Sequence, residues 1–270
     1  MLESLLKYQF LQNAVAAALL ASISCGIIGT LIIEKKLIMM SGGIAHTSYG
    51  GVGLGYLLGF EPLLGAFVFS ILSAFSIGFL KRKGGVRTDV VIGLLWALGM
   101  ALGIFFIAIT PGYPPDLTSY LFGNILSITK SDLLLIFLIT VFVAATVVLF
   151  FNHWKAFLFD DEFAAILGVK TVFLHYFLLI LIAITIVALI RVVGIILALS
   201  LLCAPAASAG LLSVKLKNRM IISIFLGFFF CFSGLWLSYE INFPSGAAIV
   251  MFSVSCYIIL YIFRAISAKS

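Results

Sequence analysis

His46 stands in the middle of an apolar, glycine-rich run, residues 37–60, that is long enough to cross a bilayer. Hydrocarbon penalises ionisable side chains strongly, so a histidine at such a place marks a pathway or a functional site by default. Neutral imidazole is a good ligand for zinc and other transition-metal ions. One histidine cannot form a tight site, but a transport pathway must also release its ion. The alternative interpretation of His46 is a hydrogen bond to a neighbouring helix.

The run around His46 predicts a helix with two specialised faces. At about 100° per residue, its small residues divide into two sets. The first set shares a face with the histidine and forms a candidate ion pathway, with His46 as the candidate metal ligand: Gly42, His46, Tyr49 and Gly53. The second set lies nearly opposite and has the spacing that lets another helix approach closely: Gly51, Gly55 and Gly59. The first face combines missing side-chain volume with an imidazole, as a narrow conduit for a cation requires.

The composition shows what must position this helix. Of 270 residues, 64% are hydrophobic and only 10% are charged, which is typical of a polytopic membrane protein and outside the range of soluble domains. About 20 residues cross the hydrocarbon core, and the longest charged or Gly/Pro-broken stretch is itself only about that long. We therefore expect a single transmembrane domain over residues 1–270.

The apolar runs predict an all-α fold with about nine transmembrane helices, within a range of about eight to ten. Their expected bounds are residues 13–33, 37–59, 62–80, 90–109, 133–151, 172–190, 194–214, 220–239 and 244–263.

Lys and Arg orient this layout, because loops rich in them stay cytoplasmic. With the N-terminus outside and the C-terminus in the cytoplasm, only Lys7, Lys130 and Arg191 fall on the outer side. The other basic residues all fall on the inner side. The formal net charge of +6 follows from this topology and gives no reason to expect nucleic-acid binding.

Proline interrupts the pattern at two places. Three prolines between residues 110 and 116 end the fourth predicted helix, and residues 117–128 are too short to cross, which predicts a short interfacial helix on the outer face. Pro205 removes a helical hydrogen bond near the carbonyl of Leu201, and small residues follow it. We expect a kinked and closely packed helix at Pro205.

The cytoplasmic connection over residues 152–171 predicts a short helix of its own. Asp160 can cap the helix, Asp161 and Glu162 suit its positive first turn, and Gly168 can end it after about two turns. Its side chains are largely apolar, with Phe163 among them. A docking element for a soluble partner is one interpretation, and a helix lying on lipid headgroups is the other.

The sequence contains no Gly-x-x-x-x-Gly-Lys-Ser/Thr motif and no Gly-Lys pair, so this chain cannot supply a phosphate-binding loop of that type. If transport uses ATP, another subunit must bind it. A Gly-x-Ser-x-Gly nucleophile elbow is absent too. We therefore do not expect an enzyme.

Five stretches resemble the membrane permeases of metal-ion ABC importers, the branch associated with zinc, manganese and iron. They are residues 41–59 with a Gly-Ile-Ala-His core, 116–128 with Tyr-Leu-Phe-Gly, 159–169, 193–207 and 244–247. Each motif alone is permissive, and their order along almost the full chain carries the resemblance.

The resemblance implies a homodimeric permease in a prokaryotic cell membrane, with cytoplasmic ABC ATPase subunits and an extracytoplasmic metal-binding protein. The transported divalent metal ion would be its substrate, no cofactor would be tightly bound, and ATP would bind to the partner subunits. His46 corresponds to the pathway histidine of the family. The residues of the cytoplasmic segment would form the helix that couples the permease to the ATPase: Asp160, Asp161, Glu162, Phe163 and Gly168.

One departure bears on the metal. Many relatives carry an aspartate four residues before the pathway histidine, and this chain has Gly42 there. Loss of a hard anionic oxygen weakens a site for manganese more than a site for zinc, so we expect zinc, with manganese or iron as alternatives. A stand-alone, ion-coupled secondary carrier or cation channel is the alternative function. The absence of several intramembrane carboxylates counts against it.

Overall fold

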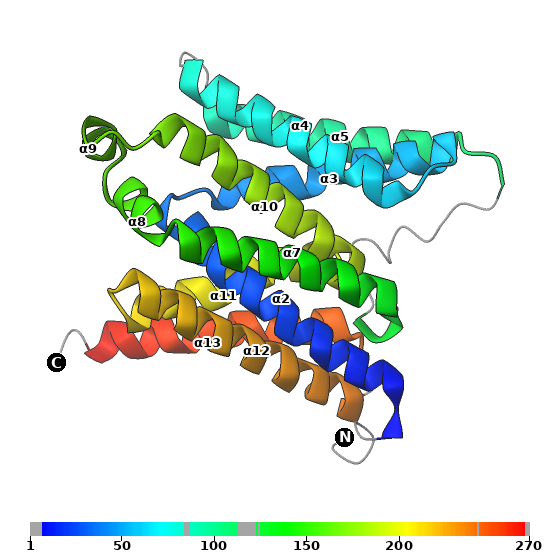
Figure 1. Cartoon of the computed structure of the whole chain (residues 1–270). Coiled ribbons are helices and arrows are strands. Elements are labelled where there is room, and N and C mark those ends of the chain that lie inside the picture. The colour runs from blue at the N-terminus through cyan, green and yellow to red at the C-terminus, as the bar shows by residue number, and fades with distance from the viewer. Residues whose placement is uncertain (1–6, 84–86, 113–122, 124, 242, 268–270) are drawn as a thin grey trace. The chain divides into compact units, whose positions relative to one another are not determined.

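The computed structural model describes residues 7–83, 87–112, 123, 125–241 and 243–267. Within these ranges the chain forms helices joined by short connections and contains no strand (Figure 1). The helices are α2 (Gln9–Glu34), α3 (Ile38–Leu58), α4 (Pro62–Lys83), α5 (Thr88–Ala108), η1 (Ile125–Ser127), α7 (Lys130–Leu149), α8 (Phe151–Phe159), α9 (Asp161–Ile166), α10 (Thr171–Val193), α11 (Ile195–Leu212), α12 (Leu216–Ile241) and α13 (Ser245–Ser267). The predicted all-α class is confirmed.

Every predicted span occurs as a helix, with bounds that differ from the prediction by four residues at most, as where α2 begins at Gln9 instead of residue 13. The helix ends follow local chemistry. Pro62 opens α4, where its missing N–H is no loss. Gly59 ends α3 with a φ of 72°, a left-handed conformation that favours glycine. Gly194, with a φ of 80°, separates α10 from α11 in an otherwise continuous apolar run.

Eight of the described helices are long and apolar enough to cross a membrane, and α3 is not among them. Its 21 residues include several glycines and hydroxyl side chains as well as His46, which lower its mean hydropathy. Most of its residues are buried. The helix that carries the candidate site is therefore one that other protein surfaces shield from lipid.

The chain forms two compact units. The first consists of Met1–Lys35, Thr118–Leu149 and Ala188–Ser270, and the second of Lys36–Leu117 and Phe150–Val187. Helix α10 begins in the second unit and ends in the first. The single domain over residues 1–270 stays a prediction.

In the first unit, α2 packs against α7, α11 and α12. The contact with α11 is close, because a Cβ at Gly29 would collide with the carbonyl of Leu202. Helix α13 packs against α11 and α12, where a Cβ at Gly234 would lie 2.5 Å from Cα of Ile249. Small residues thus bring these backbones together, as membrane helices require.

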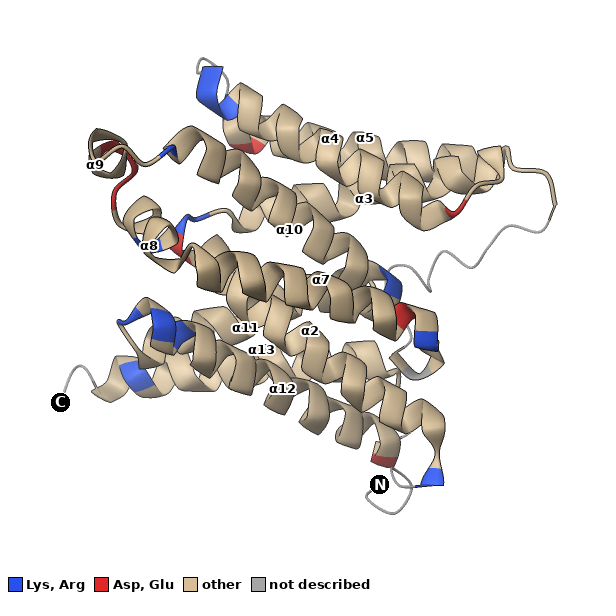
Figure 2. Cartoon of the chain, in the orientation of Figure 1, with Lys and Arg blue, Asp and Glu red and all other residues tan. Residues whose placement is uncertain are grey.

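The charged residues of the first unit lie near the ends of its helices (Figure 2). At one end Arg219 of α12 pairs with Glu34 of α2. At the opposite end of the same helices, Asn13 of α2 donates to the carbonyl of Ile128, 3.3 Å away, and Arg191 pairs with Asp132 at 3.0 Å. Between those ends the described helices of the unit carry no charged residue, and several hydroxyl groups there bond within the protein, such as Ser200 with Ser253 at 2.8 Å.

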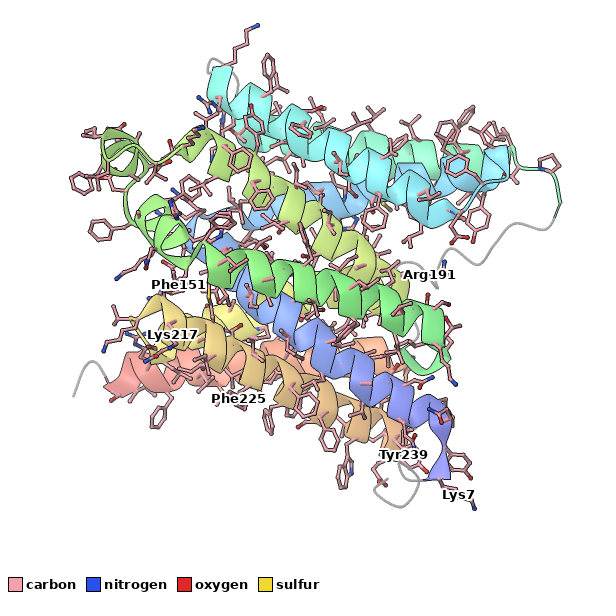
Figure 3. All side chains as sticks on the ribbon, viewed as in Figure 1. Lys7, Phe151, Arg191, Lys217, Phe225 and Tyr239 are labelled. Carbon is pink, nitrogen blue, oxygen red and sulfur yellow. The ribbon has the colours of Figure 1, made fainter. Side chains whose placement is uncertain are left out.

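The outward faces of the first unit are apolar between those ends. Figure 3 shows Lys217 and Tyr239 toward opposite ends of α12, with Phe225 projecting between them. The side chain of Phe225 is 71% exposed. An exposed apolar side chain between two polar helix ends suits contact with lipid tails.

In the second unit, α3 packs against both α4 and α5. The C-terminal half of α4 contacts the N-terminal part of α10. There the ring of Phe75 stacks on that of Tyr176, with centroids 5.7 Å apart. Gly78 makes room there, since a Cβ on it would lie 3.0 Å from the Tyr176 ring.

One connection differs from the prediction, and a second lies largely outside the described residues. The connection between α7 and α10 contains α8 as well as the expected short helix, because residues 151–159 include no Gly or Pro that would end a helix. The predicted outer helix over residues 117–128 lies largely outside the described residues, of which Ile125–Ser127 form the single turn η1.

Candidate ion pathway

Glycines fix the position of α3 between its two neighbours. A Cβ at Gly51 would collide with the backbone of Gly65 in α4, and one at Gly55 would lie 2.6 Å from Cα of Pro62. On the other side, a Cβ at Gly53 would lie 2.5 Å from the carbonyl oxygen of Gly103 in α5. Both neighbours therefore approach α3 backbone to backbone, and any larger residue at these positions would separate them.

A hydrogen bond adds to the contact between α3 and α5. Thr47 lies 3.1 Å from the carbonyl oxygen of Leu95 and 2.7 Å from that of Gly43 in its own helix. The hydroxyl is buried. This contact fixes the rotation of α3 about its axis at the residue next to His46.

His46 lies against a tryptophan. Its imidazole stacks on the ring of Trp96 in α5, with centroids 4.0 Å apart and planes inclined by 10°. Both side chains are partly buried. Nδ1 of His46 is buried and has no hydrogen-bond partner among the described residues. The ring is therefore held by stacking, and a nitrogen that can bind a proton or a metal ion is left without a protein partner.

The other predicted pathway residues also lie against α5. Tyr49 is 2% exposed and its ring covers Gly103. Gly53 meets the same glycine, so the volume that it leaves is filled by the neighbouring backbone. Gly42 differs, because a Cβ there would meet only Trp96, at an ordinary contact distance of 3.5 Å. Space is thus left beside His46 at Gly42, and closed at Gly53.

Among the residues predicted to pack helices, Gly59 has a different role. Nothing lies within 4 Å of a Cβ placed on it, and its left-handed conformation ends α3 instead. Pro205 lies buried within α11, which continues through it to Leu212. The small Ala206 beside it faces Gly29 of α2, 3.3 Å from a Cβ placed there. The functional roles of all these residues stay predictions.

The short helix α9 has the caps that the sequence predicts. The carboxylate of Asp160 accepts from the backbone N–H groups of Glu162 and Phe163 at 2.9 and 3.0 Å. At the other end Gly168 has a φ of 83°, and the N–H of Val169 donates to the carbonyl of Ala164 at 3.0 Å. Asp161 and Glu162 lie in the first turn.

Between its caps α9 presents an exposed apolar surface. Phe163 is 56% exposed and Ile166 is 82% exposed, and Phe159, just before the helix, is 90% exposed. Such a cluster on a two-turn helix suits contact with a partner protein.

Sequence reasoning missed Trp96 and the contacts of Thr47. Trp96 lies 50 positions from His46 along the chain, and no local periodicity relates the two. The signal that could have found it is a lone tryptophan in an apolar run that also contains the small residues Gly99 and Gly103.

This fold and site define a class: a polytopic membrane protein in which a glycine-rich helix, bearing a histidine, is shielded by more apolar helices. The sequence matches the family described as ABC 3 transport family over residues 7–264. The chain therefore belongs to the ABC 3 transport family, and the predicted resemblance to permeases of metal-ion ABC importers is confirmed.

Relatives align along nearly their whole length. An uncharacterized membrane protein of Synechocystis sp. is 41% identical over 259 residues, covering 96% of this chain and 92% of that protein. The manganese transport system membrane protein MntC of Listeria monocytogenes is 35% identical over 262 residues, covering 97% and 93%. The structure of PsaBC from Streptococcus pneumoniae in complex with Fab contains a chain that is 31% identical and superposes with a TM-score of 0.87, covering 96% of this chain and 94% of that one.

Proposed function

We propose that this chain is the permease of an ATP-driven importer for a divalent transition-metal ion. The observation that carries the proposal is His46, an imidazole stacked on Trp96 with an unpartnered buried nitrogen, on a helix that lipid does not solvate. The family membership supports transport driven by ATPase subunits, and it argues against a carrier or channel that works alone. The Listeria relative is named for manganese transport, which supports a metal substrate.

We infer that zinc is preferred over manganese. The family resemblance implies an aspartate at the position of Gly42, and a Cβ placed on this glycine would meet Trp96 at 3.5 Å. Among the described residues, no three His, Cys, Asp or Glu side chains come together in a way that could hold a metal ion. An imidazole without a carboxylate is a better ligand for zinc than for manganese. Few ligands also suit an ion that must leave again.

Conformational changes driven by ATP hydrolysis would reach the proposed pathway through α9. Its exposed apolar side chains and its two caps support the role of a rigid helix that docks in a groove of an ABC ATPase subunit. Asp160, Asp161, Glu162, Phe163 and Gly168 would then couple ATP hydrolysis to transport. We place α9 in the cytoplasm, with the N-terminus outside and the C-terminus inside, on the distribution of Lys and Arg.

The remaining partners follow from the family resemblance. A second copy of the chain would complete the pathway, and an extracytoplasmic metal-binding protein would deliver the ion to the outer ends of the helices. ATP would bind to the ATPase subunits, and the metal ion would be the substrate of the whole assembly.

Cellular metal content tests this function. Cells with and without the gene are grown under zinc limitation and under manganese limitation, and both metals are measured by mass spectrometry. We expect zinc to fall in cells that lack the gene, and to recover when the gene is restored. Loss of manganese alone would overturn the zinc assignment, and unchanged content of every transition metal would overturn the proposed function.

A further inference from the structure

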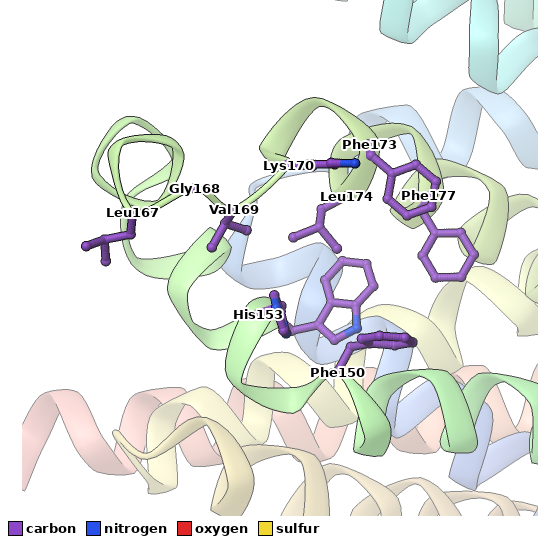
Figure 4. A pocket seen from close by; sticks show the side chains of 10 residues that line it. Phe150, His153, Leu167, Gly168, Val169, Lys170, Phe173, Leu174 and Phe177 are labelled. Atoms are coloured by element: carbon purple, nitrogen blue, oxygen red, sulfur yellow. The ribbon is translucent and has the colours of Figure 1, made fainter.

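A cavity of about 450 Å³ lies within the second unit, where α8 meets the start of α10 (Figure 4). Phe150 and His153 line it on the α8 side, and Val169, Lys170 and Phe173 line it on the other. No residue of α3 lines it, and neither do the exposed Phe159 at the end of α8 and Ile166 at the end of α9. The proposed transport function leaves this cavity unexplained.

The polar side chains that line the cavity are His153, Trp154 and Lys170, and the indole and ammonium groups are donors only. Trp154 lines it, is fully buried, and its Nε1 has no acceptor among the described residues. Lys170 is exposed and makes no ion pair in the described part of the chain. No carboxylate lines the cavity. A ligand with a negatively charged acceptor would form a charge-assisted hydrogen bond with the Lys170 ammonium group.

The rest of the lining is apolar. Phe150, Phe173 and Phe177 contribute aromatic surface, and Leu167 and Leu174 contribute aliphatic surface. The indole of Trp154 stacks on Phe177 with centroids 6.1 Å apart. A ligand for this cavity is therefore an amphiphile, with an anionic group at one end and hydrocarbon at the other.

The positions of the lining residues along the chain indicate the level of the membrane at which the cavity lies. Phe150 directly follows α7 and Lys170 directly precedes α10, and both helices are candidate membrane spans. The cavity thus lies where hydrocarbon gives way to headgroups. Basic pockets at this level bind the headgroups of anionic lipids, and a tryptophan is favoured there.

We propose that this cavity binds an anionic phospholipid, whose phosphate accepts from Lys170 and whose acyl chain lies against Phe173 and Phe177 beside the Trp154 indole. Bound lipid would fix α8 against the start of α10. It would thereby fix the positions of the two helices between which α9 lies along the chain.

Quenching of Trp154 fluorescence tests the proposal directly. The full chain, with Trp96→Phe and Trp236→Phe so that Trp154 is the only tryptophan, is placed in phosphatidylcholine bilayers that contain increasing fractions of phosphatidylglycerol with brominated acyl chains. The readout is lipid contact and does not depend on transport. We expect saturable quenching at low fractions of brominated phosphatidylglycerol, and weaker, non-saturating quenching by brominated phosphatidylcholine.

Two variants sharpen the test. Lys170→Gln is expected to raise the lipid fraction at half-quenching about fivefold, as expected for one basic residue at a membrane surface. Lys155→Gln removes an exposed lysine next to Trp154 that does not line the cavity, and it should leave the curve unchanged. Lys170→Arg keeps the charge and should bind like the parent protein, which guards against a folding defect.

Three results would overturn the proposal. Equal quenching by both brominated lipids would show that the cavity does not select anions. An equal effect of Lys155→Gln would show that only general surface charge matters. Loss of quenching when purified ATPase subunits bind would show that the cavity belongs to a protein interface.

Discussion

The stacking of His46 on Trp96 gives this imidazole a fixed orientation without using its nitrogens. In many metal sites a carboxylate or carbonyl holds the ligand imidazole through its second nitrogen. Here Nδ1 is buried and free of protein partners in the described part of the chain. An aromatic ring in place of a polar partner holds the imidazole but does not raise its basicity, which suits weak binding of a passing ion.

Gly42 tests whether metal preference depends on the missing carboxylate. A Cβ at this position fits, because it meets only Trp96 at 3.5 Å. We predict that Gly42→Asp raises manganese uptake relative to zinc uptake, since manganese favours oxygen ligands. Gly42→Ala adds the same Cβ without the carboxylate and serves as the control. If both variants change the ratio of the two uptake rates equally, steric effects and not ligand chemistry set the preference.

Trp96 should matter through its ring. Trp96→Leu removes a stacking contact worth about 0.5–1.5 kcal/mol, so we predict a rise of about two- to tenfold in the zinc concentration for half-maximal uptake. Trp96→Phe keeps an aromatic face and should change it less. Trp236→Leu, on α12 in the other unit, is the matched control. An effect of Trp236→Leu as large as that of Trp96→Leu would argue against a specific role for the stack.

At the scale of elements, α3 is held by backbone contacts on two sides and α9 by its two caps. The spans could be predicted from sequence, because apolar runs punctuated by charge, Gly and Pro mark them without knowledge of neighbours. The capped α9 could be predicted for the same reason, since Asp160 and Gly168 cap it through contacts with residues close to them in the sequence. Helix α8 could not, because Phe150 before it offers no side-chain cap and the polar Asn152, His153 and Lys155 make residues 151–159 resemble part of a loop.

The packing of α3 on α5 predicts a large effect from a single methyl group. A Cβ at Gly53 would lie 2.5 Å from a carbonyl oxygen of α5, so we predict that Gly53→Ala destabilises the protein by about 1–3 kcal/mol. Gly93→Ala, on α5 with nothing within 4 Å, is the control and should be neutral or slightly stabilising, because alanine favours a helix more than glycine does. Thermal unfolding in detergent measures both. A Gly53→Ala variant as stable as the parent would show that α3 and α5 are not in close contact.

The cap of α9 separates folding of this helix from its surface chemistry. Asp160→Ala removes two charge-assisted hydrogen bonds and should weaken the helix by about 1 kcal/mol, with fewer ions transported per ATP hydrolysed. Asp160→Asn keeps an N-cap of similar strength and should retain coupling. Simultaneous measurement of uptake and hydrolysis gives the ratio. If Asn is as damaging as Ala, charge at Asp160 matters beyond the cap.

At the scale of the whole molecule, eight of the described helices are apolar enough to cross a membrane, and the proposed site lies on α3, which is less apolar. Helix α13 is an example, since Met251 and Ile259 are both largely exposed while its Ser253 is buried and hydrogen-bonded to Ser200 of α11. The sequence revealed this division because His46 and its glycines stand out from every other run. Contacts between distant residues, such as Arg219 with Glu34, could not be predicted, since nothing local links the partners.

The most direct test of the central claim is zinc uptake by the assembled transporter with His46→Ala. The permease is reconstituted in liposomes with its ATPase and binding-protein partners, and uptake and ATP hydrolysis are measured together. We predict that uptake falls about tenfold or more while assembly with the ATPase is retained, as expected for loss of at least about 1.4 kcal/mol of interaction with the ion. Ser48→Ala, a buried position on the same helix whose hydroxyl bonds only to its own turn, should transport normally. Zinc uptake by His46→Ala at the rate of the unaltered protein would contradict a pathway through this histidine.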